Sequence, residues 1–483
     1  MTRIVLGPFN RVEGDLEVSL EVESGQVVSA QVNSPMFRGF EQMLVGRVPE
    51  DALAIVPRIC GICSVAQSAA AAAALADIAG VKPPPNGILA HRLITATENL
   101  ADHLSHFYLF FMPDFTRSEY AGRAWHGAVS ARFTAIKGAA APSVLQARAR
   151  FFNLTGFLAG RWPHSLALQP GGSTKAMTPA ERIRILAVLR EFRGFLETVI
   201  FGDALESFST LANEDALLAW AAGRPGDFPL FLHAATDLGL NQLGRATDHF
   251  MSYGAYDLFN AGVWQPNSTG SDGFVRGAVT PVNSELITED TRSAWLADAA
   301  PKSPAQGETR VDAEKPGAYT WCKAPRYGQQ VVETGALARQ VVAGNWLARD
   351  MVGRHGASVT ARVVARMIEL ARVLPAMEAW VREIVPGEPF CVPAPLPESG
   401  EGVGLIEAAR GGLGHWLSVK RGRIERYQII APTTWNFSPR DSAGQPGPLE
   451  QALVGAKVGD QPTPLSVQHI VRSFDPCMVC TVH

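Results

Sequence analysis

Apolar and polar residues alternate near the start of the chain. Within residues 15–22, apolar side chains occupy every second position, and residues 27–32 continue a strand-like pattern after Gly25. A period of two is typical of a β-strand that buries one face. We therefore predict a β-hairpin or small meander over residues 3–35, with its turn at residues 23–25.

Helical patterns dominate the middle of the chain. An alanine-rich run follows Cys63 and extends to Ala76, and alanine is the strongest helix former. Cys60 and Cys63 are therefore expected at or just before the N-terminus of a helix, where free amide groups favour thiolate over thiol. Further helices are predicted from longer apolar-periodic stretches, at 88–112, 179–212, 333–353 and 357–384.

Two other regions differ in composition. Residues 254–332 are rich in Gly, Pro, Ser and Asn, yet aromatic residues recur throughout, so an extended excursion or small β region is expected there. Residues 402–440 return to strand-like and turn-like patterns. We predict one domain over 1–483, mainly α with small β appendages (α+β). Its long-helix bundle is expected to bring the two ends of the chain together, including a C-terminal segment at 402–483.

Composition narrows the classes of function. Of the 483 residues, 47% are hydrophobic and 18% are charged, and the formal net charge is −3. A chain without an excess of basic residues shows no sign of the basic surface that nucleic-acid-binding proteins use. No apolar run reaches the roughly 18–20 residues that a bilayer-spanning helix needs. The first residues pass directly into a predicted strand with no secretory leader pattern, so a cytoplasmic location is expected.

Cysteine usage points to metal or redox chemistry. Four of the six cysteines form two CxxC pairs, Cys60 with Cys63 and Cys477 with Cys480. Four soft thiolates select zinc, copper(I), iron–sulfur clusters or nickel. A zinc site usually has its two pairs about 15–20 residues apart, whereas here nearly the whole chain separates them. A zinc clasp, a functional metal centre and a redox dithiol all remain open on spacing alone.

The other two cysteines and two of the histidines are not expected to bind metal. Cys322 and Cys391 are expected to be ordinary, semi-buried thiols. His103 and His106 are spaced for one helix, and a core or hydrogen-bonding role is expected for them rather than metal ligation.

The residues that flank the cysteines recur as short motifs along the chain. In order, they are Arg11-Val12-Glu13-Gly14, Phe37-Arg38-Gly39-Phe40-Glu41, Arg58-x-Cys60-Gly61-x-Cys63, Asp102-His103-x-x-His106-Phe107-Tyr108, Ala324-Pro325-Arg326-Tyr327, Ala409-Arg410-Gly411-x-Leu413-Gly414-His415, Pro432-Thr433-Thr434-Trp435-Asn436 and Asp475-Pro476-Cys477-x-x-Cys480-x-x-His483. Through these motifs the chain resembles the large subunit of the nickel–iron hydrogenases, at both ends and over much of the middle.

The resemblance implies an enzyme that splits dihydrogen at a nickel–iron centre. All four cysteines would bind nickel, and Cys63 and Cys480 would also bridge to a low-spin iron that carries carbon monoxide and cyanide. Cys60 and Cys477 would be terminal on nickel, which makes Cys477 the first proton acceptor. Glu13 would then relay the proton, as a carboxylate within hydrogen-bond reach can.

The resemblance assigns further residues and partners. Arg410 would lie over the metals, held by Asp102 and Asp475. Glu41, the backbone carbonyl of Ile429 and the terminal His483 would form a magnesium site, although histidine is an unusual ligand for that ion.

Electrons would leave through an iron–sulfur small subunit, because this chain has no further cysteines to hold clusters near the site. Maturation proteins are also implied as partners, since the family commonly loses a short extension after this terminal histidine once nickel is bound.

Two departures from the family pattern suggest a subgroup. Ile62 stands where many members have valine, and Phe110 stands where leucine is common. Both positions line the mouth of the family's gas channel, so larger side chains would slow molecules bigger than dihydrogen. The pair is similar to the regulatory, hydrogen-sensing branch, which turns over slowly, resists oxygen and signals to a histidine kinase. Ordinary core drift, an energy-conserving uptake hydrogenase and a non-catalytic protein with a zinc clasp are the alternatives.

Overall fold

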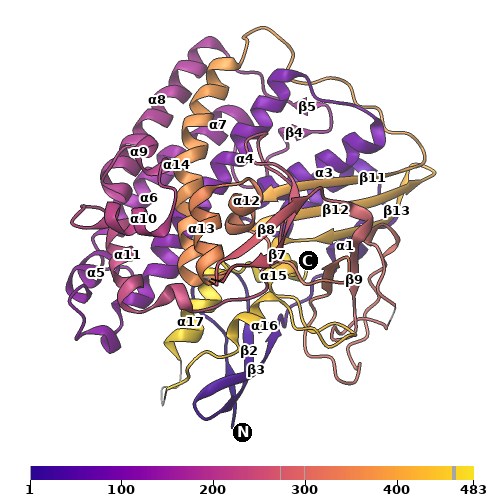
Figure 1. Cartoon of the computed structure of the whole chain (residues 1–483). Coiled ribbons are helices and arrows are strands. Elements are labelled where there is room, and N and C mark those ends of the chain that lie inside the picture. Colours follow the sequence, from indigo (N-terminus) through magenta and orange to yellow (C-terminus); the bar gives the residue numbers. More distant parts are fainter. Residues whose placement is uncertain (1, 272, 299, 460–463) are drawn as a thin grey trace.

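The structure is a computed structural model that describes residues 2–271, 273–298, 300–459 and 464–483. A body of long helices lies beside a three-stranded sheet, and a smaller sheet is built from the N-terminal residues (Figure 1). This arrangement confirms the predicted α+β class with its bundle of long helices.

The helical body is centred on one long helix. The main helices of this body are α4 (Pro85–Ser105), α6 (Ala140–Phe151), α7 (Asn153–Ala159), α8 (Pro179–Phe195), α9 (Leu205–Ser209) and the central α14 (Val359–Glu383). Helix α14 packs against α4, α8 and α9, and most of its side chains are buried. Shorter helices surround this group: α5 (His126–Phe133), α10 (Glu214–Ala221), α11 (Asp227–Asp237), α12 (Ala336–Val342) and α13 (Trp346–His355).

Two of the predicted long helices are interrupted. The stretch 179–212 forms α8, a π-helical turn η6 (Leu196–Phe201) and then α9. The break falls at Gly202, whose φ is +62° and where a Cβ would lie 1.8 Å from the carbonyl oxygen of Pro225, so the close approach of another segment ends the helix. The stretch 333–353 divides into α12 and α13, and the Asn345 side chain caps α13.

The N-terminal residues form the predicted meander. Strands β1 (Thr2–Leu6), β2 (Glu17–Glu23) and β3 (Gln26–Asn33) make an antiparallel sheet with β2 in the middle. The turn between β2 and β3 lies at residues 24–25, and the alternate residues Val18 and Leu20 are fully buried. Helix α16 (Pro448–Leu453) packs against β3, which ties this sheet to the C-terminal part of the chain.

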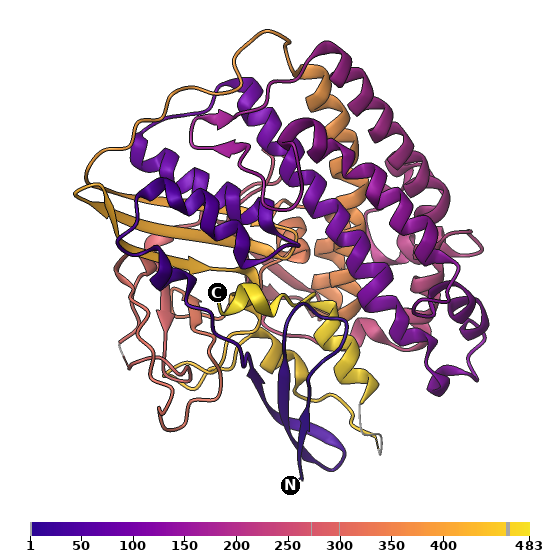
Figure 2. The same cartoon turned by 180° about the vertical axis from the view of Figure 1, so that it is seen from behind.

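A second antiparallel sheet supports one half of the cysteine site. It contains β11 (Gly400–Ala408), β12 (Gly411–Lys420) and β13 (Arg423–Ile430), and helix α3 (Ser64–Ala79) lies across β11 and β12 (Figure 2). The helix and sheet approach closely because Gly404 has no side chain: a Cβ there would lie 2.0 Å from the Ala70 carbonyl oxygen. Alanine on α3 and glycine on β11 therefore hold the start of α3 next to the β11–β12 turn.

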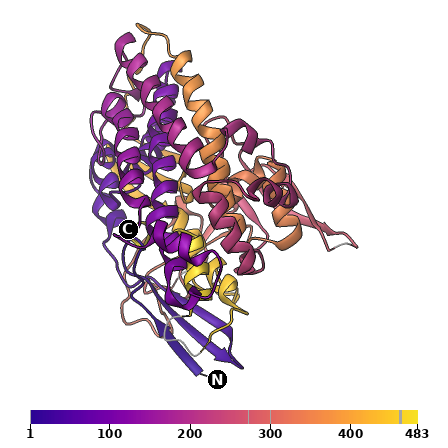
Figure 3. The same ribbon diagram turned by 90° about the vertical axis from the view of Figure 1, so that its left-hand side faces the viewer.

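The region 254–332 is the β-containing excursion that composition predicts. It includes β7 (Gly262–Thr269) and β8 (Val275–Thr280), which join β6 (Phe250–Ser252), and the pair β9 (Ile287–Asp290) and β10 (Ala324–Tyr327). The β7–β8 hairpin projects from the body of the molecule (Figure 3). A further small pair, β4 (Leu168–Gln169) and β5 (Gly172–Ser173), lies after α7.

The C-terminal residues end inside the molecule. Helix α15 (Pro432–Asn436) follows β13, α17 (Leu465–Ser473) packs against α14, and the short α18 (Met478–Thr481) carries the last cysteine. The terminal His483 is 6% exposed. Near the N-terminus, α1 (Phe40–Leu44) and α2 (Ala52–Ile55) lead into the first cysteine pair. Within the described part of the chain, no helix combines the length and apolarity needed to cross a bilayer.

Candidate metal centre

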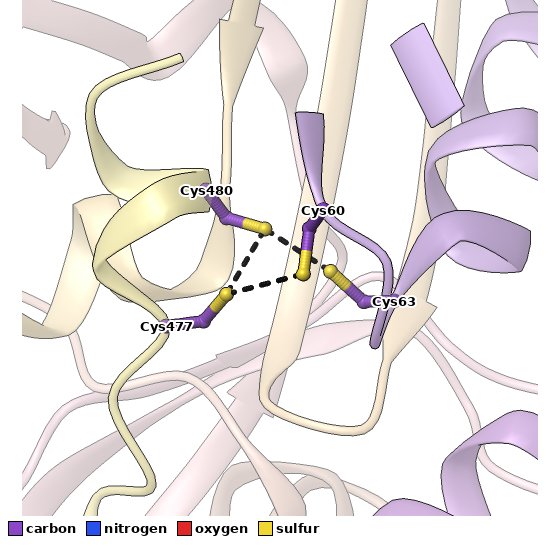
Figure 4. Close-up of side chains that lie close together, drawn as sticks. All are labelled: Cys60, Cys63, Cys477 and Cys480. Carbon is purple, nitrogen blue, oxygen red and sulfur yellow. Dashed lines mark hydrogen bonds between the residues drawn. The ribbon is translucent and has the colours of Figure 1, made fainter. Parts of the chain in front are cut away.

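Four cysteine sulfurs meet in one buried cluster (Figure 4). The Sγ atom of Cys63 lies 3.0 Å from that of Cys480, and the Sγ atom of Cys60 lies 3.6 Å from that of Cys477. The sulfurs of Cys477 and Cys480 are 3.2 Å apart, and all four sulfurs lie within 4.8 Å of one another. The two CxxC pairs therefore converge, as the sequence analysis predicts.

Local structure fixes each cysteine differently. Cys60 is in extended conformation after the 3₁₀ turn η2 (Val56–Ile59), and Cys63 immediately precedes α3. Both cysteines thus lie at or before a helix start, as expected from the alanine-rich run. Cys477 precedes α18 and its N–H donates to Thr433 Oγ1 at 3.1 Å, while Cys480 lies within α18.

Crowding forces these thiols to share protons. The hydrogen bond with Cys477 lowers the pKa of Cys60 well below its usual range. Hydrogen bonds with Cys477 raise the pKa of Cys63 and of Cys480 well above theirs. One thiolate therefore suppresses ionisation of its neighbours, as like charges in a buried site do. A soft metal cation relieves this repulsion, because it binds the deprotonated form of every thiol.

A buried carboxyl caps the helix that begins at the first cysteine pair. Glu98 accepts hydrogen bonds from the N–H groups of Val65 and Ala66, each at 3.0 Å, and from Trp162 Nε1 at 2.8 Å. These groups are donors that the first turn of α3 would otherwise leave unpaired. Burial nevertheless raises the pKa of Glu98 to about 8.

Glu13 is fixed beside Cys477 by main-chain hydrogen bonds. The N–H of Met478 donates to the Glu13 carbonyl at 2.7 Å, and Glu13 forms a short parallel bridge with Cys477. Burial raises the pKa of Glu13 and the neighbouring Cys60 raises it further, against the charge of Arg410. The predicted relay residue is therefore at the sulfur cluster, with a carboxyl that takes up a proton more readily than an exposed one.

Arg410 occupies the short turn between β11 and β12 and is buried. Its Nη1 donates to Asp102 Oδ2 at 2.5 Å, and its Nη2 and Nε donate to Asp475 Oδ1 at 3.1 Å and to the Asp475 carbonyl at 2.8 Å. Burial alone would lower the pKa of Arg410, but the two carboxylates hold it well above its usual value. The guanidinium therefore stays charged.

The two aspartates compete for that one cation. Burial raises the pKa of Asp102 to about 7, even though Arg410 opposes the shift. Burial would also raise the pKa of Asp475, but Arg410 and the surrounding cationic groups keep it below its usual value. Asp475 is therefore the permanent counter-ion, and Asp102 is the partner whose charge is the more easily lost.

A second buried arginine braces the turn that carries Arg410. Arg339 donates from Nε and Nη2 to Glu369 at 2.5 and 2.8 Å, and from Nη1 to Glu407 at 2.7 Å. It also donates to the two carbonyls of residues 408–409, at 2.8 and 2.9 Å. Glu369 in turn lies 2.7 Å from His103 Nε2 on α4, next to Asp102. The network therefore links the β11–β12 turn to the helix that carries one aspartate.

Glu41 and His483 meet at the end of the chain. His483 Nε2 lies 3.2 Å from Glu41 Oε1, which also accepts from the Ile429 N–H at 2.8 Å. The Thr309 hydroxyl donates to the other oxygen, and Lys323 Nζ lies 3.3 and 3.4 Å from the carboxylate. Burial would raise the pKa of Glu41, but Lys323 and His483 hold it well below its usual value.

These residues can offer a hard cation a carboxylate, a carbonyl and an imidazole. Ile429 lies opposite His415 in the sheet, but its N–H donates to Glu41 and not to β12. In an antiparallel sheet, opposed residues either exchange both backbone hydrogen bonds or exchange none. The Ile429 carbonyl therefore also faces away from β12. Glu41, Ile429 and His483 line one cavity of about 20 Å³, room for a single water or ion. The nearby Lys323 ammonium supplies a positive charge to the same carboxylate.

The two predicted gas-channel residues lie on different elements. Ile62 is half-buried between the first two cysteines and packs against the apolar cluster that contains them. Phe110 is half-buried on the π-helical turn η3 (His106–Phe111), which continues α4.

The chain matches the protein family described as nickel-dependent hydrogenase over residues 38–129 and 142–483. It is 30% identical to the periplasmic [NiFeSe] hydrogenase large subunit of Desulfomicrobium baculatum, covering 100% of this chain and 95% of the relative. It is 27% identical to the hydrogenase-2 large chain of Escherichia coli (strain K12), over 100% of this chain and 97% of that relative. The solved Ni-Fe-Se hydrogenase from D. vulgaris Hildenborough in the reduced state aligns with a TM-score of 0.84 at 30% identity, over 100% of both chains. The chain belongs to the nickel-dependent hydrogenase family.

Family membership is consistent with a nickel–iron site at the sulfur cluster. This chain is the large catalytic subunit of a nickel–iron hydrogenase, and a large subunit implies a small-subunit partner. The cluster fits the metal, because four buried thiols on two rigid segments form a soft donor set that nickel accepts. The selenium in the names of two relatives belongs to those proteins, since all four positions here are cysteine.

Other predictions have mixed outcomes. His103 and His106 hydrogen-bond to Glu369 and to the Arg472 carbonyl, which agrees with a hydrogen-bonding role. Cys322 is fully buried, whereas Cys391 is exposed, so the expectation of two semi-buried thiols is wrong for both.

Sequence reasoning also left several hydrogenase residues without a role: Arg38, Glu98, Lys323 and Arg339. One signal could have identified some of them. Glu98 and Glu369 are ionisable residues on the buried face of an apolar-periodic helix, and such residues are rarely buried without a partner.

Proposed function

We propose that this hydrogenase subunit cleaves dihydrogen heterolytically at a nickel–iron centre held by Cys60, Cys63, Cys477 and Cys480. In this proposal Cys63 and Cys480 would also be ligands of an iron that carries carbon monoxide and cyanide. The observation that supports it best is the convergence of four buried sulfurs within 4.8 Å of one another.

The protein supplies acid–base groups around that centre. When bound, a nickel–iron centre would supply the Lewis acid that polarises dihydrogen and accepts its electron pair. The Cys477 thiolate would take the proton, because a thiolate sulfur has a lone pair that can accept one and Glu13 lies beside this residue. The adjacent Glu13 carboxylate then receives the proton from Cys477 and passes it outward. The main-chain hydrogen bond from Met478 holds the backbone of Glu13 beside the Cys477 segment.

Arg410 provides a fixed positive charge beside the thiolates. Its guanidinium is buried and bound by Asp102 and Asp475, so it neither deprotonates nor swings away. A cation placed in this way stabilises negative charge on the sulfurs and on any anionic ligand of the iron.

Two further components belong to the proposal. A magnesium ion would bind Glu41, the Ile429 carbonyl and His483, supported by the shared cavity at the end of the chain. Electrons would pass to iron–sulfur clusters in the small subunit, and maturation proteins would insert the metals.

Infrared spectroscopy of the purified heterodimer tests this function. We expect bands from carbon monoxide and cyanide bound to iron, together with hydrogen–deuterium exchange under deuterium gas. A preparation that contains nickel and iron but lacks both kinds of band would contradict the proposed centre.

We further propose that the hydrogenase acts as a hydrogen sensor in the cytoplasm, coupled to a histidine kinase. Ile62 and Phe110 support this role, since both side chains are bulkier than the valine and leucine of many relatives and would narrow the gas path.

An energy-conserving uptake hydrogenase is the second candidate. The relatives favour it by name, since they include the uptake hydrogenase large subunit of Azotobacter chroococcum mcd 1, at 27% identity. The double variant Ile62→Val with Phe110→Leu separates the two. We expect oxygen to inactivate the variant faster than the wild type, and equal inactivation rates would remove the support for the sensor.

A further inference from the structure

One side chain joins the two metal-binding segments through their backbones. Nη2 of Arg38 donates to the carbonyl oxygen of Ile59 at 2.7 Å and also to the carbonyl oxygen of Val479. Ile59 immediately precedes Cys60, and Val479 immediately precedes Cys480. A single nitrogen atom therefore holds the first cysteine segment and the last one at a fixed separation.

The position of Arg38 is itself fixed. Its guanidinium lies over the ring of Phe40, 4.9 Å from the ring centroid, and Phe40 packs against the apolar cluster that contains the four cysteines. The intervening Gly39 has a φ of +71°, a left-handed conformation that glycine adopts without strain. Helix α1 follows and carries Glu41, which contacts His483. One short segment thus binds the C-terminal residues at two points.

The chemistry of the contact requires a guanidinium. Two carbonyls on different segments need two N–H groups at the position of Nη2. Arginine supplies both there, whereas lysine has three N–H groups but ends one bond short of that position. Hydrogen bonds that orient the ligand-bearing backbone typically change metal affinity or activity by about 10–100-fold when they are removed. The same arginine also carries charge near the site, so geometry and charge must be tested separately.

We propose that Arg38 is a positioning residue that clamps the two cysteine segments together and so slows the loss of nickel. This inference rests on the nickel site proposed above. It assigns to Arg38 no contact with substrate and no proton transfer, only control of the distance between the two pairs of sulfur ligands.

The test measures nickel release from the purified heterodimer. The complex is exposed to an excess of a chelator, and the nickel that remains per chain is followed with time by elemental analysis. We expect Arg38→Ala to release nickel about tenfold faster or more. Arg38→Lys keeps the charge, but its Nζ ends one bond short of the Arg38 Nη2 position and does not reach both carbonyls, so it should behave like Arg38→Ala. Arg47→Ala is the matched control, because it removes an exposed arginine of the same N-terminal segment.

Each result bears on the inference. Release from Arg38→Ala at the rate of the wild type and of Arg47→Ala would overturn the clamp. Full retention in Arg38→Lys would also overturn it, because charge alone would then explain the effect. If Arg38→Ala does not assemble, Arg38→Lys is compared directly with the wild type. A wild-type complex without nickel would contradict the proposed function itself, which separates the two failures.

Discussion

The Nη1 atom of Arg410 lies 2.5 Å from Oδ2 of Asp102, although 308 residues separate the two in the chain. Asp475 binds the other side of the same guanidinium. Helix α4, the β11–β12 turn and the C-terminal segment therefore meet at one cation, directly beside the sulfur cluster. This junction makes Arg410 sensitive to substitutions that keep its charge and change its shape.

Replacing Arg410 by lysine tests that dependence on shape. An ammonium group can bind one carboxylate but cannot reproduce three donors in a plane. We expect Arg410→Lys to retain nickel and iron while hydrogen oxidation per bound nickel falls by about 10²–10³-fold, the usual loss when one preorganised electrostatic group is removed. Wild-type activity in this variant would show that the charge alone suffices.

Glu13→Gln separates proton transfer from assembly of the centre. The amide keeps the size of the side chain and cannot carry the proton, so we expect hydrogen–deuterium exchange with solvent to fall by about 10²–10⁴-fold at unchanged metal content. Glu21→Gln, at an exposed position of β2, is the control and should exchange normally. Exchange at the wild-type rate in Glu13→Gln would refute the relay.

Glu98 should make the stability of the complex depend on pH. Its pKa is raised from 4.5 to about 8 in the folded chain, so the folded chain holds a proton that the unfolded chain releases. The stabilising contribution is full below pH 4.5 and is lost as the pH rises through about 8. The thermal midpoint of the wild type should therefore fall relative to that of Glu98→Gln between about pH 5 and 8.5. If calorimetry shows that the thermal midpoints of the wild type and of Glu98→Gln change in parallel with pH, the raised pKa of Glu98 is contradicted.

Arg339→Met removes the brace of the Arg410 turn. The substitution leaves Glu369 and Glu407 buried without their cation, and breaking a buried pair in this way costs about 3–5 kcal/mol. We expect a large drop in the free energy of unfolding, measured with denaturant. Adding Glu369→Gln should recover part of it, because one uncompensated charge is then gone. A double variant no more stable than the single one would argue against the charge network.

Local patterns predicted the elements that depend on local forces. Alternation predicted β2 and β3, and the alanine run placed Cys63 at the start of α3. The break at Gly202 was missed, because it depends on the Pro225 carbonyl approaching from a distant segment. Propensity within a window contains no information about such a contact.

In the candidate site, too, local motifs were predictable and contacts between distant segments were not. The cysteines stand in contiguous CxxC motifs, and the resemblance to the hydrogenase family is what assigned a role to Glu13 and one shared metal to the two pairs. The role of Arg38 could not be predicted, since its partners are carbonyl oxygens of remote segments. Any residue offers a backbone carbonyl, so no sequence signal marks it as a partner.

X-ray absorption at the nickel edge of the purified heterodimer tests the central claim most directly. The account predicts about one nickel per large subunit, surrounded by sulfur atoms from Cys60, Cys63, Cys477 and Cys480, with iron as a close neighbour. Zinc in place of nickel, or a nickel shell composed mainly of nitrogen and oxygen, would contradict it.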